Sequence, residues 1–316
     1  MIKGPTFTIP RKYLKAFTMN GMIRIKFDWF FGDTSGEILN WTNDFYNDLK
    51  NTVSEAVKKG GNIYYSTDHL MPKVFNKYPV ASKTVAVIGS ATPLYEAYID
   101  YFKGKPLTIE YRKIKHNIPK LQTYTFDQAV KKINQNKLKT DCALCYSSIE
   151  HSGLGRYGDY IDPEGDFFTM KLVKKMIKPD GLLFLQIPIG SDLLLWNNTR
   201  IYGKHRLLLL LEGWKLLDVF GYSPELLDQL PDGSSQDAIF VLQNAKPDNS
   251  QQQLFTNEII VGFQALETNR SPWHKKIKKL SKEFVYKKPD KNPRINYTSP
   301  PKVSFKKIVN KIVKLF

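Results

Sequence analysis

The stretch from Ser147 to Asp166 carries the densest set of reactive side chains in this sequence. It contains five acidic residues, one histidine, one arginine and four glycines. It follows an apolar run over residues 141–146 that we expect to be a buried strand. A loop that only connects two elements could be far shorter. The composition therefore predicts a functional loop.

Within this loop, three residues are candidates for proton transfer. We predict His151 as the general base, with Glu150 and Asp159 as further catalytic residues, because imidazole and carboxylate groups are the usual carriers of protons in catalysis. The alternative for His151 is a structural role, with its ring hydrogen-bonded inside the loop.

The aspartates of the same loop suggest a second chemistry. Asp159, Asp162 and Asp166 offer hard oxygen ligands, which would hold a divalent cation that acidifies a hydroxyl. Closely spaced Asp and Gly residues also form turns and caps, which is the alternative.

Further polar residues lie in the loop and after the next apolar run, at residues 181–187. Arginine and tyrosine side chains there would contact a carboxylate, a phosphate or a sugar. Alternatively they brace the acidic loop, because its five acids otherwise lack partners. The predicted substrate contacts are Arg156, Tyr157, Asn197, Arg200 and Tyr202, with Asn198, His205 and Arg206 nearby.

These residues need elements that hold them at one edge of a sheet. From residue 83 onward, short apolar runs alternate with helical patterns, which is typical of an open, mostly parallel α/β sheet. Such sheets bind ligands beyond the carboxyl ends of their strands. The expected strands are 84–88, 107–110, 141–146, 181–187, 214–220 and 237–242, and the expected helices are 93–102, 126–135, 167–177 and 207–211.

The first of these strands runs into a turn suited to a ligand. Gly89 permits a sharp bend and close backbone approach, and Ser90 follows it. Glu110 ends the next strand at the spacing where an acid reaches the ribose hydroxyls of an adenosine. A single turn glycine, with Glu96 in the first helical turn, disfavours the pyrophosphate of a nicotinamide cofactor. S-adenosylmethionine carries no phosphate and suits the pattern; the alternative is an ordinary tight turn and a solvated strand end.

Several short motifs then point to a known family. They are Val87-Ile88-Gly89-Ser90, Ile109-Glu110-Tyr111, the Ser-Ser-Ile-Glu-His-Ser-Gly-Leu-Gly-Arg-Tyr-Gly-Asp run from Ser147, Lys178-Pro179-Asp180-Gly181, Ile187-Pro188-Ile189-Gly190 and Asn198-Thr199-Arg200-Ile201-Tyr202-Gly203.

Over residues 60–243 the chain resembles the domain-of-unknown-function family 268, found in nematodes and bacteria, which is similar to class I S-adenosylmethionine-dependent methyltransferases. The resemblance implies a Rossmann-like sheet with an antiparallel last strand. It implies that Gly89, Ser90 and Glu110 contact S-adenosylmethionine, with Ser147 and Ser148 beside the methyl donor. The sequence departs from the wider superfamily in lacking the second and third glycines of the first motif.

Charge and composition divide the chain. We predict an N-terminal extension over residues 1–80 that packs on the core and contains one helix near residues 44–58, a methyltransferase-like domain over 81–245, and a polar linker with a basic tail over 246–316. Residues 271–316 carry 14 Lys and Arg against 2 acids, in a chain of net charge +17. The tail ends in a basic amphipathic helix pattern, which favours an anionic membrane surface over RNA, because it lacks regularly spaced aromatic platforms. The alternative is that the lysines of the tail are simply exposed to solvent and bind no partner.

The cellular location follows from what the sequence lacks. It has no apolar run long enough to span a membrane and no secretory signal, so we expect a cytoplasmic protein that can lie on the inner membrane face. Cys142 and Cys145 are three positions apart in a strand and should face opposite ways, which disfavours a disulfide between them.

Two functions follow from this reading. The first is a methyltransferase that uses S-adenosylmethionine to modify a hydroxyl of a glycan or a related polar metabolite. The second is a non-catalytic, methyltransferase-like binding module at a membrane surface. A nucleotide-sugar enzyme using NAD is disfavoured by Glu96 and the single glycine.

Overall fold

A computed structural model describes residues 2–30, 37–222 and 233–246. Contacts divide the chain into Met1–Asn269 and Arg270–Phe316, and every described residue belongs to the first unit. The predicted basic tail and its terminal helix therefore lie outside the described residues. No helix of the described part is long and apolar enough to cross a bilayer.

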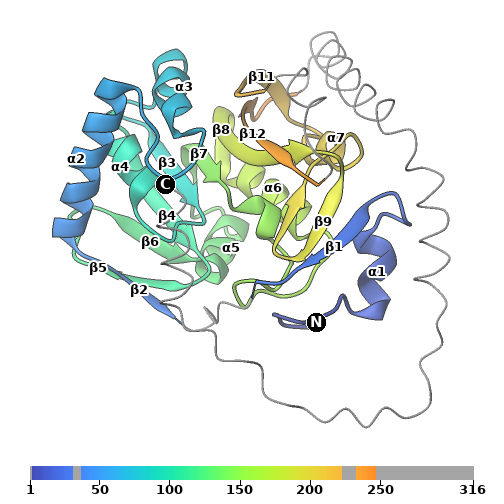
Figure 1. Cartoon of the computed structure of the whole chain (residues 1–316). Coiled ribbons are helices and arrows are strands. Elements are labelled where there is room, and N and C mark those ends of the chain that lie inside the picture. The colour runs from blue at the N-terminus through green and yellow to red at the C-terminus, as the bar shows by residue number, and fades with distance from the viewer. Residues whose placement is uncertain (1, 31–36, 223–232, 247–316) are drawn as a thin grey trace, which may run out of the picture. The chain divides into compact units, whose positions relative to one another are not determined.

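A mostly parallel sheet forms the centre of the described unit (Figure 1). Its order is β11-β12-β8-β7-β3-β4-β6, with β12 antiparallel to both of its neighbours. The predicted Rossmann-like sheet with an antiparallel last strand is confirmed. The strands are β3 (Thr84–Ile88), β4 (Lys105–Glu110), β6 (Gln122–Thr125), β7 (Thr140–Tyr146), β8 (Ile177–Gly190), β11 (Lys215–Phe220) and β12 (Ser235–Gln243).

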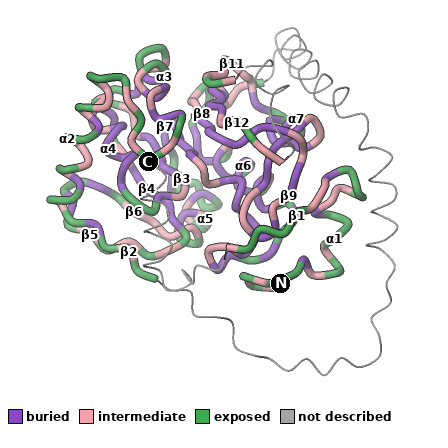
Figure 2. Tube along the Cα trace, viewed as in Figure 1, coloured by how far each residue is buried: buried purple, intermediate pink, exposed green. Residues whose placement is uncertain are grey.

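Helices cover both faces of this sheet, because its strands are apolar on both sides. One face packs against residues of α2, α3 and α4, and the other against residues of α5, α6 and α7. Figure 2 shows the buried strands between these layers. Cys142 and Cys145 lie in opposite clusters, as the alternation predicted. The helices are α2 (Asn43–Lys59), α3 (Met71–Lys77), α4 (Leu94–Tyr101), α5 (Phe126–Asn134), α6 (Gly165–Met176) and α7 (Arg206–Leu210).

Local signals fix where these helices begin and end. The Thr42 side chain accepts a hydrogen bond from Phe45 N and starts α2, which ends at Gly60 in the left-handed conformation. Thr125 and Gln128 form a reciprocal capping box that starts α5.

The N-terminal residues pack against residues that are distant from them in the sequence. Strand β1 (Arg24–Asp28) pairs in parallel with β9 (Leu193–Asn197), which also pairs with β10 (Thr199–Ile201). Trp196 of β9 and Phe17 of α1 (Arg11–Phe17) meet edge to face in a third apolar cluster. The remaining elements are β2 (Ile38–Trp41), which pairs with β5 (Lys113–His116), and the short helices η1 (Asp68–Leu70) and η2 (Ile149–His151).

The sequence expectations located each core element to within a few residues, apart from β6 and the longer β8. They missed the elements of the N-terminal region except α2, and also β5, β9, β10 and the short helix η2. The predicted domain boundaries stay predictions.

Candidate active site

The carboxyl ends of β3, β4 and β7 meet where the strand order reverses, which is the position at which open α/β sheets bind ligands. After β3 the chain bends at Gly89, with φ of +74°. The next backbone N–H, of Ser90, donates to Glu110 Oε2 at 2.8 Å. The two sequence-predicted ends of the cofactor site are therefore in direct contact.

A second carboxylate lies behind this turn. Glu96 is fully buried in α4 and accepts hydrogen bonds from Ser90 Oγ at 3.0 Å and from Thr108 Oγ1 at 2.7 Å. Burial raises the pKa of Glu96 to about 7, although both hydrogen bonds oppose the rise. Glu96 therefore supports the turn from the core.

The residues present fit the adenosine part of S-adenosylmethionine. Glu110 Oε1 accepts from Arg112 N at 3.3 Å and Nε at 3.1 Å, so with Ser90 three donors reach a carboxylate that has about four acceptor positions. One position remains for a ribose hydroxyl. Next to Glu110, the Tyr111 ring stacks on the Phe126 ring, with the ring centroids 4.6 Å apart. This aromatic surface is of the kind that stacks on a nucleobase such as adenine.

The end of the site predicted to lie beside the methyl donor is more closely packed. A Cβ placed on Gly89 would lie 2.0 Å from Ser148 Oγ, so the Ser148 side chain lies directly over the bend. Glycine is required there both by its φ and by this approach. Ser148 must change rotamer before a ligand can contact Gly89 itself.

Glu150 is the buried acid nearest to the end of β7. Its side chain is 2% exposed, and Oε2 has no hydrogen-bond partner among the described residues. Burial raises the pKa of Glu150 to about 7, against hydrogen bonds from its own backbone and from Ser147. Ser147, with φ of +46°, also contacts Tyr65. A carboxylate that has a pKa near neutrality and one oxygen without a hydrogen-bond partner is suited to accept a proton.

His151 has a different environment. Its Nδ1 lies 2.7 Å from Asn198 O, and the Arg156 guanidinium lies 3.1 Å from His151 Nδ1. Burial, and secondly the charge of Arg156, lower the pKa of His151 to about 3. The ring is therefore neutral near pH 7 and already hydrogen-bonded, and its predicted role as the base stays a prediction.

The arginine beside this histidine holds the loop to the N-terminal segment. Arg156 donates to Asn198 Oδ1 at 2.5 Å, and its guanidinium carbon lies 3.9 Å above the Phe30 ring. The Tyr157 ring lies 5.1 Å from the same guanidinium. Asn197 Oδ1 accepts from Phe30 N at 2.9 Å. Three of the predicted substrate contacts thus gather at one place.

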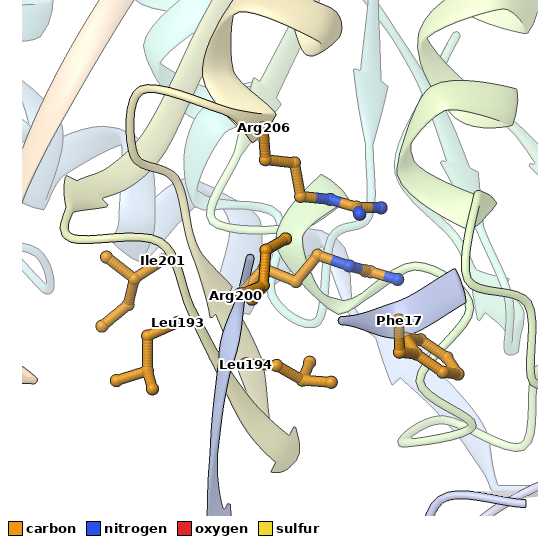
Figure 3. Close-up of a pocket in the computed structure, with 7 residues that line it drawn as sticks. Phe17, Leu193, Leu194, Arg200, Ile201 and Arg206 are labelled. Carbon is orange, nitrogen blue, oxygen red and sulfur yellow. The ribbon is translucent and has the colours of Figure 1, made fainter. Parts of the chain in front are cut away.

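The other two predicted substrate contacts belong to a buried ionic network. Asp166 accepts two hydrogen bonds from Arg206, at 2.6 and 2.8 Å, and one from Tyr202 at 3.0 Å. Arg200 lies 3.8 Å from Asp166 and donates to Ser152 O at 2.6 Å. Figure 3 shows the two arginines one above the other, with their guanidinium groups toward the same side. The network braces the loop against α6 and α7; substrate contact by Arg200 and Tyr202 stays a prediction.

The predicted divalent cation finds no support. Asp159 accepts backbone N–H groups of Gly153 and Gly155, at 2.8 and 3.2 Å, which makes it a turn residue. Asp162 accepts from Glu164 N at 2.9 Å, and Asp166 is neutralised by arginine. The three carboxylates have separate partners, and no metal-binding group of three such side chains exists in the described ranges.

Sequence reasoning missed several residues of the site. Arg112 and Tyr111 directly follow Glu110, so their position beyond the strand was a usable signal. Tyr65 and Asp237 lie far from Glu150 in sequence, and nothing local pointed to them. Asp237 has a raised pKa because of burial, and its Oδ2 lies 3.5 Å from Ser66 Oγ.

Comparisons with known proteins place this geometry in context. A family model described as "Caenorhabditis protein of unknown function, DUF268" matches residues 82–241. No curated protein matches the chain.

Solved structures with similar folds were also found. A Burkholderia thailandensis 1,6-didemethyltoxoflavin-N1-methyltransferase with bound S-adenosylhomocysteine has 10% identity and a TM-score of 0.39, over 65% of this chain and 91% of that one. A TehB-like methyltransferase from Corynebacterium glutamicum has 12% identity and a TM-score of 0.37, over 64% and 97%. TehB from Haemophilus influenzae has 9% identity and a TM-score of 0.40, over 62% and 66%. These values assign no activity to the chain.

Proposed function

Since the chain belongs to the family described as Caenorhabditis protein of unknown function, DUF268, as its motifs predicted, we propose that it is an S-adenosylmethionine-dependent methyltransferase acting on a hydroxyl of a glycan or polar metabolite. The observation that carries the proposal is the contact of Ser90 N with Glu110 at the point where the strand order reverses. This contact puts Glu110, the acid predicted to bind the ribose, beside a backbone bend, at the edge where such sheets bind ligands.

The chain's own residues would hold the cofactor from two sides. Glu110 would accept a ribose hydroxyl at its remaining acceptor position, and Tyr111 would lie against the adenine. Gly89 and Ser148 would border the methionine part once the Ser148 side chain has rotated. S-adenosylmethionine supplies an electrophilic methyl group for transfer to a nucleophile.

Glu150 would then serve the acceptor. A hydroxyl is a weak nucleophile until a base removes its proton, and Glu150 Oε2 is buried and unpaired at the end of β7. Its pKa of about 7 leaves a large ionised fraction at neutral pH and makes its conjugate base stronger than an ordinary carboxylate. His151, held by Asn198 O, would position the loop rather than move the proton.

A polar acceptor is favoured by the surroundings of Glu150. The carboxylate of Asp237 is close enough to raise the pKa of Glu150, and Glu150 in turn raises the pKa of Tyr65, while Ser66 Oγ lies 3.5 Å from Asp237 Oδ2. Several hydroxyl and carboxylate groups around one base suit a polyhydroxylated molecule better than an apolar one. The substrate class rests on these groups.

Titration calorimetry of the full chain with S-adenosylmethionine and S-adenosylhomocysteine tests the cofactor site. We expect both to bind, and Glu110→Gln to weaken both at least about tenfold, because an amide replaces the charged acceptor. Glu164→Gln changes an exposed acid and serves as the control. Failure of both compounds to bind would contradict the proposal.

The acceptor requires a second experiment. The protein is incubated with methyl-labelled S-adenosylmethionine and a polar extract of its source, and the product is hydrolysed to sugars. Label recovered in an O-methyl sugar supports the substrate class. Label found only in protein or apolar lipid contradicts it.

Two observations favour a second function, a methyltransferase-like binding module without catalysis. Three donors already reach Glu110, and the Ser148 side chain lies over Gly89. If neither compound binds in calorimetry, and Ser148→Gly does not restore binding, the binding module is the better description.

A further inference from the structure

Three aromatic side chains form one exposed face on the N-terminal region. Phe27 and Trp29 project from the same side of the chain at and just after β1, with ring centroids 5.7 Å apart. Trp29 Nε1 donates to Phe7 O at 2.7 Å, which brings the third residue beside them. Their exposed fractions are 68% for Phe7, 47% for Phe27 and 52% for Trp29. We call these residues the N-terminal aromatic face.

Such exposure is costly and unusual for large apolar side chains that are neighbours. Contiguous exposed apolar patches mark surfaces that bind a partner or a membrane. Leu14 of α1 and Met22 before β1 are also exposed, at 42% and 53%. The same short region therefore presents aliphatic as well as aromatic groups to solvent.

Outside residues 271–316, the net positive charge of the chain is concentrated in the same region. Residues 2–30 contain six Lys and Arg and one acid, whereas residues 31–270 contain 27 of each sign. The net charge of the chain outside its last 46 residues thus resides in the N-terminal region. Arg11, Lys12 and Lys15 of α1 and Lys26 of β1 are exposed.

We propose that the N-terminal aromatic face inserts into the interface of an anionic lipid bilayer while exposed basic residues of the same N-terminal region contact the headgroups. Trp and Phe side chains beside Lys and Arg are the composition of interfacial membrane contacts. Aliphatic Leu14 and Met22 gain by leaving water in a bilayer but have no stacking role on a nucleic acid. The basic charge selects an anionic surface over a neutral one.

This surface is joined to the loop of the candidate site. Gly4 N donates to Asp159 O at 3.1 Å, and Ile161 N donates to Ile2 O at 2.8 Å. Strand β1 pairs along its length with β9, which ends at Asn197. Asn197 contacts Phe30, and the next residue, Asn198, contacts Arg156. A bilayer bound at the N-terminal aromatic face would therefore lie beside the loop. The inference does not depend on methyl transfer.

Quenching of Trp29 fluorescence by brominated lipid measures insertion directly. Trp41, Trp196 and Trp214 are buried, and Trp273 is replaced in a Trp273→Phe full-length chain, so Trp29 is the exposed indole that remains. Vesicles of brominated phosphatidylcholine, with and without phosphatidylglycerol, are the probe. We expect strong quenching with the anionic vesicles, much weaker quenching without them, and loss of the quenching in Trp29→Phe.

Substitutions separate this face from the basic tail. Phe7→Ser with Phe27→Ser should lower partitioning roughly tenfold, since two apolar contacts are lost, whereas Phe168→Ser, at a similarly exposed phenylalanine of α6, should not. Arg11→Gln with Lys12→Gln should lower it about 10- to 30-fold at low salt.

Two results would overturn the inference. One is cosedimentation with anionic vesicles without quenching of Trp29, which would place the contact elsewhere. The other is a change in Trp29 fluorescence when an oligonucleotide or a protein is added, together with no change when any of the vesicles is added.

Discussion

The protonation of Glu150 gives the sharpest prediction, because one buried carboxylate affects both stability and proposed chemistry. Burial raises its pKa from 4.5 to about 7. An acid whose pKa is raised on folding binds its proton more tightly in the folded state. Ionisation of Glu150 therefore does not destabilise the folded state below pH 4.5, and it destabilises the folded state by its full amount above pH 7.

The size of this penalty follows from the pKa. One pKa unit corresponds to about 1.4 kcal/mol, so the ionised Glu150 costs the folded state about 3 kcal/mol at about pH 8. Glu150→Gln keeps the shape of the side chain and removes the charge. The difference in unfolding free energy, variant minus wild type, should be near zero at about pH 4 and rise to about 3 kcal/mol above pH 7.

Urea unfolding of both proteins across this pH range measures the difference, and contributions from other groups, such as Glu96, cancel. Glu212→Gln, at an exposed glutamate, is the matched control and should give a constant difference. A pH-independent difference for Glu150→Gln would refute the buried, ionisable Glu150 described above. Methyl transfer by the same variant should fall about 100-fold or more, whereas unchanged transfer would exclude Glu150 as the base.

Other substitutions probe the rest of the site. Asp166→Asn should destabilise the protein by about 3–5 kcal/mol in urea unfolding, because it leaves two buried arginines without their counter-charge; a loss below about 1 kcal/mol would contradict the network. The pKa of His151 is lowered from 6.5 to about 3, so the stability it contributes is present above pH 6.5 and lost as the pH falls. His151→Gln should therefore flatten the loss of stability between pH 6.5 and pH 3, and an unchanged slope would argue against a buried neutral ring. Gly89→Ala should cost about 2 kcal/mol or more through its positive φ and its clash with Ser148, and a double-mutant cycle with Ser148→Gly should recover the clash.

The sequence located the frame of the site because the signals for it are local. The apolar strands, the glycine at the end of the first strand and the acid at the end of the second are read from short runs of residues. Parallel strands that follow one another place their ends at one edge, so Gly89, Glu110 and Ser147 were expected at the site. The cap signals of α2 and α5 are local in the same way.

The environment of each reactive group was not accessible in this way. Asp166 and Arg206 are 40 positions apart and become partners only because α6 and α7 pack together. The low pKa of His151 and the raised pKa of Glu150 depend on burial, which sets the cost of carrying a charge. The pKa values of these two neighbours in sequence are thus shifted in opposite directions, and the spacing of apolar residues in the sequence does not predict this difference.

The sequence by itself determined most of the strands and helices of the central sheet, the edge at which reactive residues gather and the confinement of net charge to the two ends of the chain. Only the tertiary structure decided which acids are paired with arginine and which are left unpaired, and that the N-terminal strand joins β9 beside the loop. The physical reason is that backbone patterns form over a few residues, whereas desolvation and ion pairing depend on groups that folding brings together from distant parts of the chain.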